Sequence, residues 1–313
     1  MKDTSARDCL CLFNTDVSGR LDPGWQAGVL HQRTRTIKAG PMAYVECYPI
    51  WSTRHAKEAR SEARKEAHRR AQERVHARNA RRKLERLVNV NFAADDLIVT
   101  CTYAQGEGPE DGKQAQRDIT AYLRRIAYMR KKRSLSVMRY IYVTEKTSSA
   151  KYGVRYHHHV IMSGGITQAD AQEVWRKKHA WICNAKIAQP TERHLSGFAR
   201  YMTLNKAGRT LEADGKNPQQ RVMRRRWNPS KNLVDPLETV ADKKISIRKA
   251  GRIAEAISDF AQAKEMFAKL YPDYELLEVS AKRSPWAAGV YIYAELTRKR
   301  DGTGAGGRKN RRG

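Results

Sequence analysis

Two strand-like runs joined by a short turn constrain the fold of this chain more than any other feature. "SVMRYIYVTE", residues 136–145, and "YHHHVIM", residues 156–162, are rich in β-branched and aromatic residues. A Gly-containing turn separates them, so the two strands can pair in an antiparallel hairpin. Another β-rich run, "DDLIVTCTY" at 95–103, comes earlier in the chain. We therefore expect three strands of one sheet within about 70 residues.

Helices are expected around these strands. Between the first two strands, apolar residues recur at spacings of three and four, which is typical of an amphipathic helix: Ala115, Ile119, Tyr122, Leu123, Ile126 and Met129. Thr167 with Asp170 resembles a capping box and predicts another helix start. Further helices are predicted over about 191–206 and 238–270, and the alternating run "GVYIYAEL" at 289–296 predicts a last strand.

Three consecutive histidines lie in the second strand of the hairpin. Successive side chains of a strand point to opposite faces, so His157 and His159 share one face while His158 points to the other. The neighbouring strand ends at Glu145, whose carboxylate the hairpin would bring beside these imidazoles. Two histidines and one carboxylate form a divalent metal site suited to Mg²⁺ or Mn²⁺. The alternative is surface polarity without chemistry, and this is the interpretation we give to His158.

A strongly basic composition indicates the class of partner. The 313 residues include 61 Lys and Arg against 33 Asp and Glu, a net charge of +28. Such an excess attracts polyanions, so nucleic acid is the leading partner. The five cysteines include no Cys-x-x-Cys pair, which supports neither a disulfide framework nor a zinc ribbon. No apolar run approaches the length of a membrane helix, and we expect a cytoplasmic protein without a membrane partner.

The N-terminal part divides into two segments. Residues 1–52 are polar and predicted to be irregular, with no assignable function. Residues 53–90 are rich in Ala, Arg, Glu and Lys and predict a long basic helix. Because it lacks a wide apolar stripe, we do not expect a core helix. A basic arm that binds DNA or a protein and a self-supporting solvated helix both fit this segment.

Tyr201 is a candidate nucleophile in "ERHLSGFARYMTLNK". Leu195, Phe198 and Met202 trace the buried side of the predicted helix, and Tyr201 lies at its edge. Its hydroxyl could reach the sheet, or the ring could simply fill the border of the core. Spacing alone leaves both interpretations open.

The order of these motifs resembles that of the HUH endonucleases. "IVTCTY", "YIYVTE", "YHHHVIMSG" and "FARYMTLNK" follow the family order, and "WNPSKNLVDP" and "GVYIYAEL" resemble the distal part of bacterial plasmid and prophage rolling-circle initiators. The resemblance implies an α+β fold: a ferredoxin-like or RRM-like antiparallel sheet with helices on one face, to which a long basic N-terminal helix is added. It implies an endonuclease domain over 91–298 with a basic, helical insertion at about 207–285, followed by a disordered basic tail at 299–313.

The resemblance also assigns roles to individual residues. His157 and His159 match the two histidines of the family motif, Glu145 matches the third ligand, and Tyr201 matches the nucleophile. Positions 197 and 205 are Gly and Asn, which indicates a single-tyrosine enzyme. Lys206 is the nearest match to the lysine that follows the tyrosine in many relatives.

A basic segment at 221–231, "RVMRRRWNPSK", is predicted to contact DNA. Its cations suit phosphates and its tryptophan suits base stacking; the residues concerned are Arg224, Arg225, Arg226, Trp227 and Lys231. The alternative is a solvated loop.

Together these features predict a rolling-circle replication initiator. It would nick and rejoin single-stranded origin DNA, in a hairpin, through a 5′-phosphotyrosine link. The sequence contains no P-loop motif, so we expect a host helicase and polymerase as partners. A relaxase-like or transposase-like HUH enzyme and a nonenzymatic single-stranded nucleic-acid binder are the alternatives.

Overall fold

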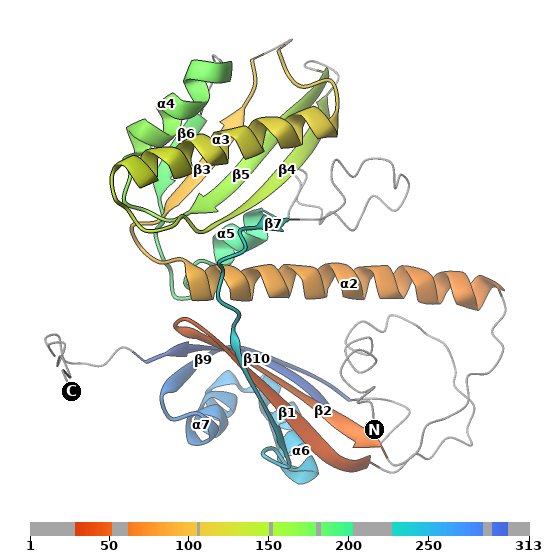
Figure 1. The fold of residues 1–313 in the computed structure, drawn as a ribbon. Coiled ribbons are helices and arrows are strands. Elements are labelled where there is room, and N and C mark those ends of the chain that lie inside the picture. Colours follow the sequence, from red (N-terminus) through yellow and green to blue (C-terminus); the bar gives the residue numbers. More distant parts are fainter. Residues whose placement is uncertain are drawn as a thin grey trace, which may run out of the picture. The chain divides into compact units, whose positions relative to one another are not determined.

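The computed structural model describes residues 29–51, 62–104, 107–149, 153–179, 183–202, 227–283 and 290–299. They form an α+β fold with two antiparallel five-stranded sheets and six α-helices among the described residues. Two compact units result, and Figure 1 shows the elements of each. The described residues of His55–Leu237 form one unit, and those of Asp22–Arg54 and Glu238–Gly313 form the second. No helix in these ranges is long and apolar enough to cross a membrane.

The first unit contains the histidine strand. Its sheet has the order β6-β3-β5-β4-β7. The strands are β3 (Leu97–Thr102), β4 (Tyr140–Ser149), β5 (Gly153–Met162), β6 (Cys183–Ile187) and β7 (Asn228–Pro229). The helices are α2 (Glu62–Asn91), α3 (Gly112–Lys132), α4 (Gln168–His179) and α5 (Ser196–Tyr201). The hairpin of β4 and β5 forms as predicted, since Glu145 pairs with His157 and Ser149 with Gly153.

Helices pack on both faces of this sheet, which corrects the expected one-sided arrangement. One face packs against α3 and α4 through Ile119, Tyr122 and Trp175. The opposite face, with Val143 of β4, packs against α5 and the end of α2. The strand alternation places a buried apolar side chain toward each face, so both faces need a cover.

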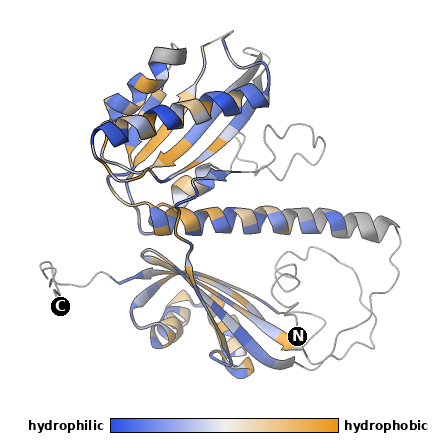
Figure 2. Cartoon of the chain, viewed as in Figure 1, coloured by the Kyte–Doolittle hydropathy of each residue, from blue (hydrophilic) through white to orange (hydrophobic). Residues whose placement is uncertain are grey.

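The last turns of α2 belong to the core, contrary to the expectation for the basic arm. Leu84, Leu87 and Val88 are buried and pack with Ala199 and Met202 of α5. Figure 2 shows hydrophilic residues along most of the coloured length of α2. The few apolar residues of this helix gather near its C-terminal end, so they cover the sheet there although the average composition is polar.

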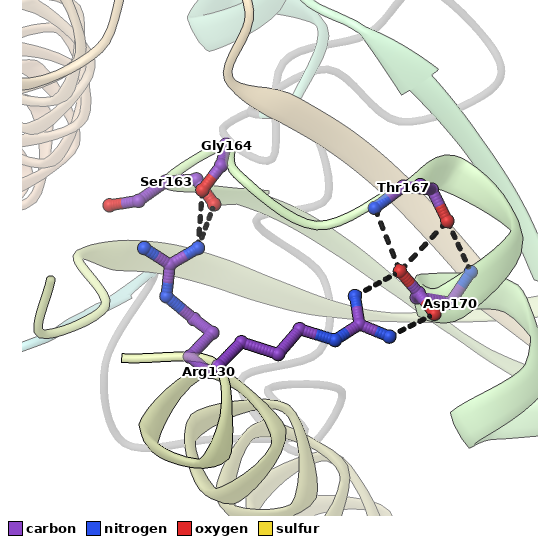
Figure 3. Close-up of polar contacts among 6 residues, drawn as sticks. Arg130, Ser163, Gly164, Thr167 and Asp170 are labelled. Carbon is purple, nitrogen blue, oxygen red and sulfur yellow. Dashed lines mark hydrogen bonds and ion pairs between the residues drawn. The ribbon is translucent and has the colours of Figure 1, made fainter. Parts of the chain in front are cut away.

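Buried Arg130 ties the end of α3 to the end of β5 (Figure 3). Its guanidinium donates to the carbonyl oxygens of Ser163 and Gly164, and also to that of Ser136. A Cβ on Gly164 would lie within 2.0 Å of the Asp95 carbonyl oxygen, so only glycine fits there. The Ser-Gly-Gly sequence after the histidine strand is therefore a structural junction.

The second unit has a sheet with the order β8-β1-β2-β10-β9. Its strands are β1 (Val29–Ala39), β2 (Met42–Trp51), β8 (Leu237–Asp242), β9 (Tyr274–Arg283) and β10 (Val290–Arg298). The helices α6 (Ile247–Glu255) and α7 (Phe260–Leu270) cover one face, where Ile253 and Phe267 pack against Val45 and Ile292.

This second unit corrects three expectations. Residues 29–51 form the hairpin of β1 and β2, whereas 1–52 was predicted to be irregular. The region 91–298 is not one domain, because the chain from Glu238 onward packs with that hairpin. The single helix expected over 238–270 is a strand and two helices, since Ser246 and Asp259 each cap a new helix start through a side-chain oxygen. The tail beyond residue 299 lies outside the described residues.

Candidate active site

The register of the sheet places three predicted site residues on one face. In antiparallel strands, residues directly opposite each other point to the same side. His157 lies opposite Glu145 of β4 and Thr102 of β3, and His159 lies opposite Val143 and Thr100. Glu145, His157 and His159 therefore share the face that α5 and the end of α2 cover, as the strand alternation predicts.

His159 is held between two polar partners. Its Nε2 lies 3.5 Å from Oε2 of Glu145, and its Nδ1 lies 3.2 Å from Oγ1 of Thr100. Both the imidazole and the carboxylate are largely buried. This pair fixes the orientation of the ring, because each imidazole nitrogen has its own neighbour.

Tyr201, the last residue of α5, faces this pair. Its ring lies edge-on to the ring of His159, with 5.2 Å between the centroids, yet 55% of its surface is exposed. A tyrosine that filled the core would be mostly buried, as Leu195 and Met202 are. The structure thus brings an accessible phenol to the histidine face.

Two residues of α2, which the sequence analysis did not single out, hold α5 in place. Asn89 Nδ2 donates to Ser196 Oγ at 2.8 Å, and Asn89 Oδ1 accepts from the Leu195 amide at 3.0 Å. Arg200 Nε donates to Oε1 of buried Glu85 at 3.1 Å. A helix of six residues is weak by itself and needs such anchors. A sequence signal exists: Glu85 and Asn89 are spaced four apart, beside the apolar residues of α2.

His158 lies on the opposite face and is part of the core. It is fully buried, its Nδ1 is 2.9 Å from Thr144 Oγ1, and its Nε2 is 2.8 Å from Tyr103 OH. Burial, together with the Asp118 carboxylate, raises the pKa of Tyr103 well above its usual value, so Tyr103 stays a neutral hydroxyl. His158 therefore makes structural hydrogen bonds, in agreement with the prediction that it takes no part in chemistry.

The residues on the histidine face suit a divalent cation by their chemistry. They supply imidazole nitrogens and a carboxylate, and Oε1 of Glu145 is buried without a hydrogen-bond partner among the described residues. Within the described ranges, however, no group of three or more His, Cys, Asp or Glu side chains is arranged to hold an ion. The structure brings together Glu145 and His159 as a pair, and the three-ligand set stays a prediction.

The predicted DNA-contacting residues are placed only in part. Lys206, Arg224, Arg225 and Arg226 lie outside the described residues. Lys231 is exposed in the turn that follows β7. Trp227 is half-buried and packs against the apolar cluster between the sheet and α5. Part of its ring therefore serves packing and is not open for base stacking.

One family model matches this chain. It describes the replication-associated protein ORF2 family and matches residues 96–206. The matched stretch includes β3, β4, β5 and α5, and with them the residues of the histidine face and Tyr201. No curated protein and no solved structure matches. The match supports a replication initiator family and a role in DNA replication.

Proposed function

We propose that this chain is a single-tyrosine HUH endonuclease that starts rolling-circle replication by nicking and rejoining single-stranded DNA. The observation that carries the proposal is the position of Tyr201: an exposed phenol lies edge-on to His159, beside a buried carboxylate, inside the stretch that matches a replication-associated family. A structural tyrosine in the core would not be half exposed, and an unrelated surface tyrosine would not lie against this histidine pair.

The proposed reaction transfers a phosphodiester to the protein. The phenolic oxygen of Tyr201 bonds to phosphorus as the bond to the 3′ oxygen breaks. The phenol loses its proton and the departing oxygen gains one, so atoms and charge balance. The products are a 5′-phosphotyrosine and a free 3′-OH, which can serve as a primer. Because the link keeps the energy of the broken bond, attack by a 3′-OH can reverse the step and rejoin the strands.

In this proposal His157, His159 and Glu145 would hold Mg²⁺ or Mn²⁺. Bound there, the cation would neutralise negative charge on the phosphate oxygens. The orphaned Oε1 of buried Glu145 and the mixed imidazole and carboxylate donors support this assignment. The residues themselves contribute position: Thr100 orients the ring of His159, and Glu85 and Asn89 hold the helix that carries Tyr201.

The substrate would be single-stranded origin DNA that carries a hairpin. The net charge of +28 supports a polyanionic partner, and Lys206, Arg224, Arg225 and Arg226 would contact phosphates together with exposed Lys231. The half-buried ring of Trp227 would take a smaller share in base stacking than its position in the sequence suggests. Strand separation and synthesis would be carried out by a host helicase and polymerase.

The proposal is tested by trapping the covalent link. Single strands from the DNA around the gene, labelled at the 3′ end, are incubated with the protein and Mn²⁺ and separated on a denaturing gel. We expect label to move with the protein, and EDTA or Tyr201→Phe to prevent this. Binding of the same strands without any cleavage, at every metal tested, would instead favour the nonenzymatic binder. A relaxase-like or transposase-like enzyme would give the adduct, but with strands that are not from a replication origin.

A further inference from the structure

The outer side of α3 carries a stripe of cations with one aromatic ring. At 3.6 residues per turn, Lys113, Arg117, Arg124, Tyr128 and Lys131 fall within an arc of about 60°. The buried residues of α3 lie on the opposite side of the helix: Ala115, Ile119, Tyr122, Leu123, Ile126 and Arg130. Figure 2 shows many hydrophilic positions along α3. We call the five outward residues the α3 stripe.

The charge of the α3 stripe is not compensated within the helix. The helix has seven Lys or Arg and one carboxylate, that of Asp118. Asp118 accepts hydrogen bonds from Tyr103 and Gln114, so it is engaged away from the stripe. Among the described residues, none of the four cations of the stripe forms an ion pair; Arg117 donates only to the neutral side chain of Gln114. A self-supporting solvated helix usually interleaves both signs of charge, and this one does not.

Tyr128 distinguishes this surface from an ordinary charged helix face. Its ring is 61% exposed at the centre of the cations, and the Lys132 ammonium lies 5.0 Å from the ring centroid. Val137, shortly after α3, is 82% exposed. An exposed aromatic ring between cations offers a base-stacking surface next to phosphate-binding groups, which is how sequence-tolerant single-strand sites are built.

We propose that the α3 stripe is a second binding surface for single-stranded DNA, separate from the site at Tyr201. The side of the sheet that α3 covers is opposite the face with His159 and α5, so a strand on the stripe would not occupy the reaction site. From Lys113 to Lys131 the helix rises about 27 Å, which is long enough for several nucleotides. A duplex fits less well, because its bases are stacked and offer no free face to Tyr128.

The test measures binding without cleavage. In EDTA, fluorescence anisotropy compares an oligothymidylate strand with a duplex of the same length over a range of KCl concentrations. Arg117→Gln/Arg124→Gln/Lys131→Gln should reduce the salt slope for the single strand by about 2, because each phosphate that is no longer neutralised lowers the slope by about 0.7. Tyr128→Ala should weaken single-strand binding about tenfold with an unchanged slope and unchanged duplex binding.

A matched control removes the same charge from the second unit. Arg248, Arg252 and Lys269 are exposed on α6 and α7, and their triple change to Gln should leave the salt slope near that of the unchanged protein. Equal slopes for both triple variants, or wild-type single-strand affinity in Tyr128→Ala, would overturn the proposal and leave a solvated helix face. An equal loss on the duplex would overturn it in favour of general phosphate binding. Since no adduct forms in EDTA, the result does not depend on whether Tyr201 is the nucleophile.

Discussion

Asn89 of α2 bonds to both sides of the start of α5: its Nδ2 donates to Ser196 Oγ at 2.8 Å and its Oδ1 accepts from the Leu195 amide. Because α5 is short, the position of Tyr201 depends on this junction and on the ion pair of Glu85 with Arg200. The end of the basic arm thus supports the proposed nucleophile.

Replacing Asn89 by Ala tests this junction. Removal of the two hydrogen bonds should lower the free energy of unfolding by about 1–3 kcal/mol. The displaced phenol should slow single-turnover adduct formation roughly 10- to 100-fold, with oligonucleotide affinity unchanged. Asn79→Ala, on the same helix but more than two turns before this junction, is the control. If Asn89→Ala reduced stability alone, with the adduct rate intact, the positioning role would be wrong.

The two same-face histidines and Glu145 should behave as one set. His157→Ala, His159→Ala and Glu145→Gln are each expected to abolish adduct formation and weaken Mn²⁺ binding, measured by titration calorimetry, because each removes a ligand of the proposed cation. DNA affinity should change little, since the charges that supply it lie elsewhere. Full Mn²⁺ affinity in all three variants would exclude this metal site.

His158→Ala should have a different signature. The change opens a cavity beside Trp175 and leaves the Tyr103 hydroxyl without its imidazole partner, at a cost of about 2–4 kcal/mol in unfolding free energy. Adduct formation should persist at temperatures where the variant stays folded. Thermal unfolding and the adduct assay, run on the same preparation, separate the two effects. Loss of the adduct in a fully folded His158→Ala protein would contradict the assigned facing of β5.

The contact between Arg133 and Asp170 should make stability depend on pH in the acid range (Figure 3). The hydrogen bonds from Arg133, followed by those from Thr167, hold the pKa of Asp170 well below its usual value. A lowered folded-state pKa gives stability that is present above the unfolded value, about 3.9, and is lost as the pH falls through the folded value. Asp170→Asn should therefore lower the melting temperature at pH 7 and much less near pH 2. The exposed Glu192→Gln is the control; an Asp170→Asn deficit that is equal at both pH values would rule out this linkage.

Local patterns predicted the hairpin and the facing of the histidines because both depend on alternation within a few residues. The pairing of β1 and β2 with β10 was not predictable in this way, since it joins strands that are more than 200 residues apart. The polar average of α2 concealed its buried end, and the capping side chains of Ser246 and Asp259 were overlooked in a region read as one helix. Contacts between side chains of different elements, such as Asn89 with Ser196, leave no periodic signal in a single sequence.

Mass spectrometry of the trapped adduct is the most direct test of the central claim. After reaction with a single-stranded oligonucleotide and Mn²⁺, the protein is digested with nuclease and protease, and the modified peptide is sequenced. We predict a nucleotide attached through its 5′ phosphate to Tyr201, and no adduct in Tyr201→Phe, which keeps the ring against His159. A nucleotide on any other residue, or an undiminished adduct in Tyr201→Phe, would contradict the account.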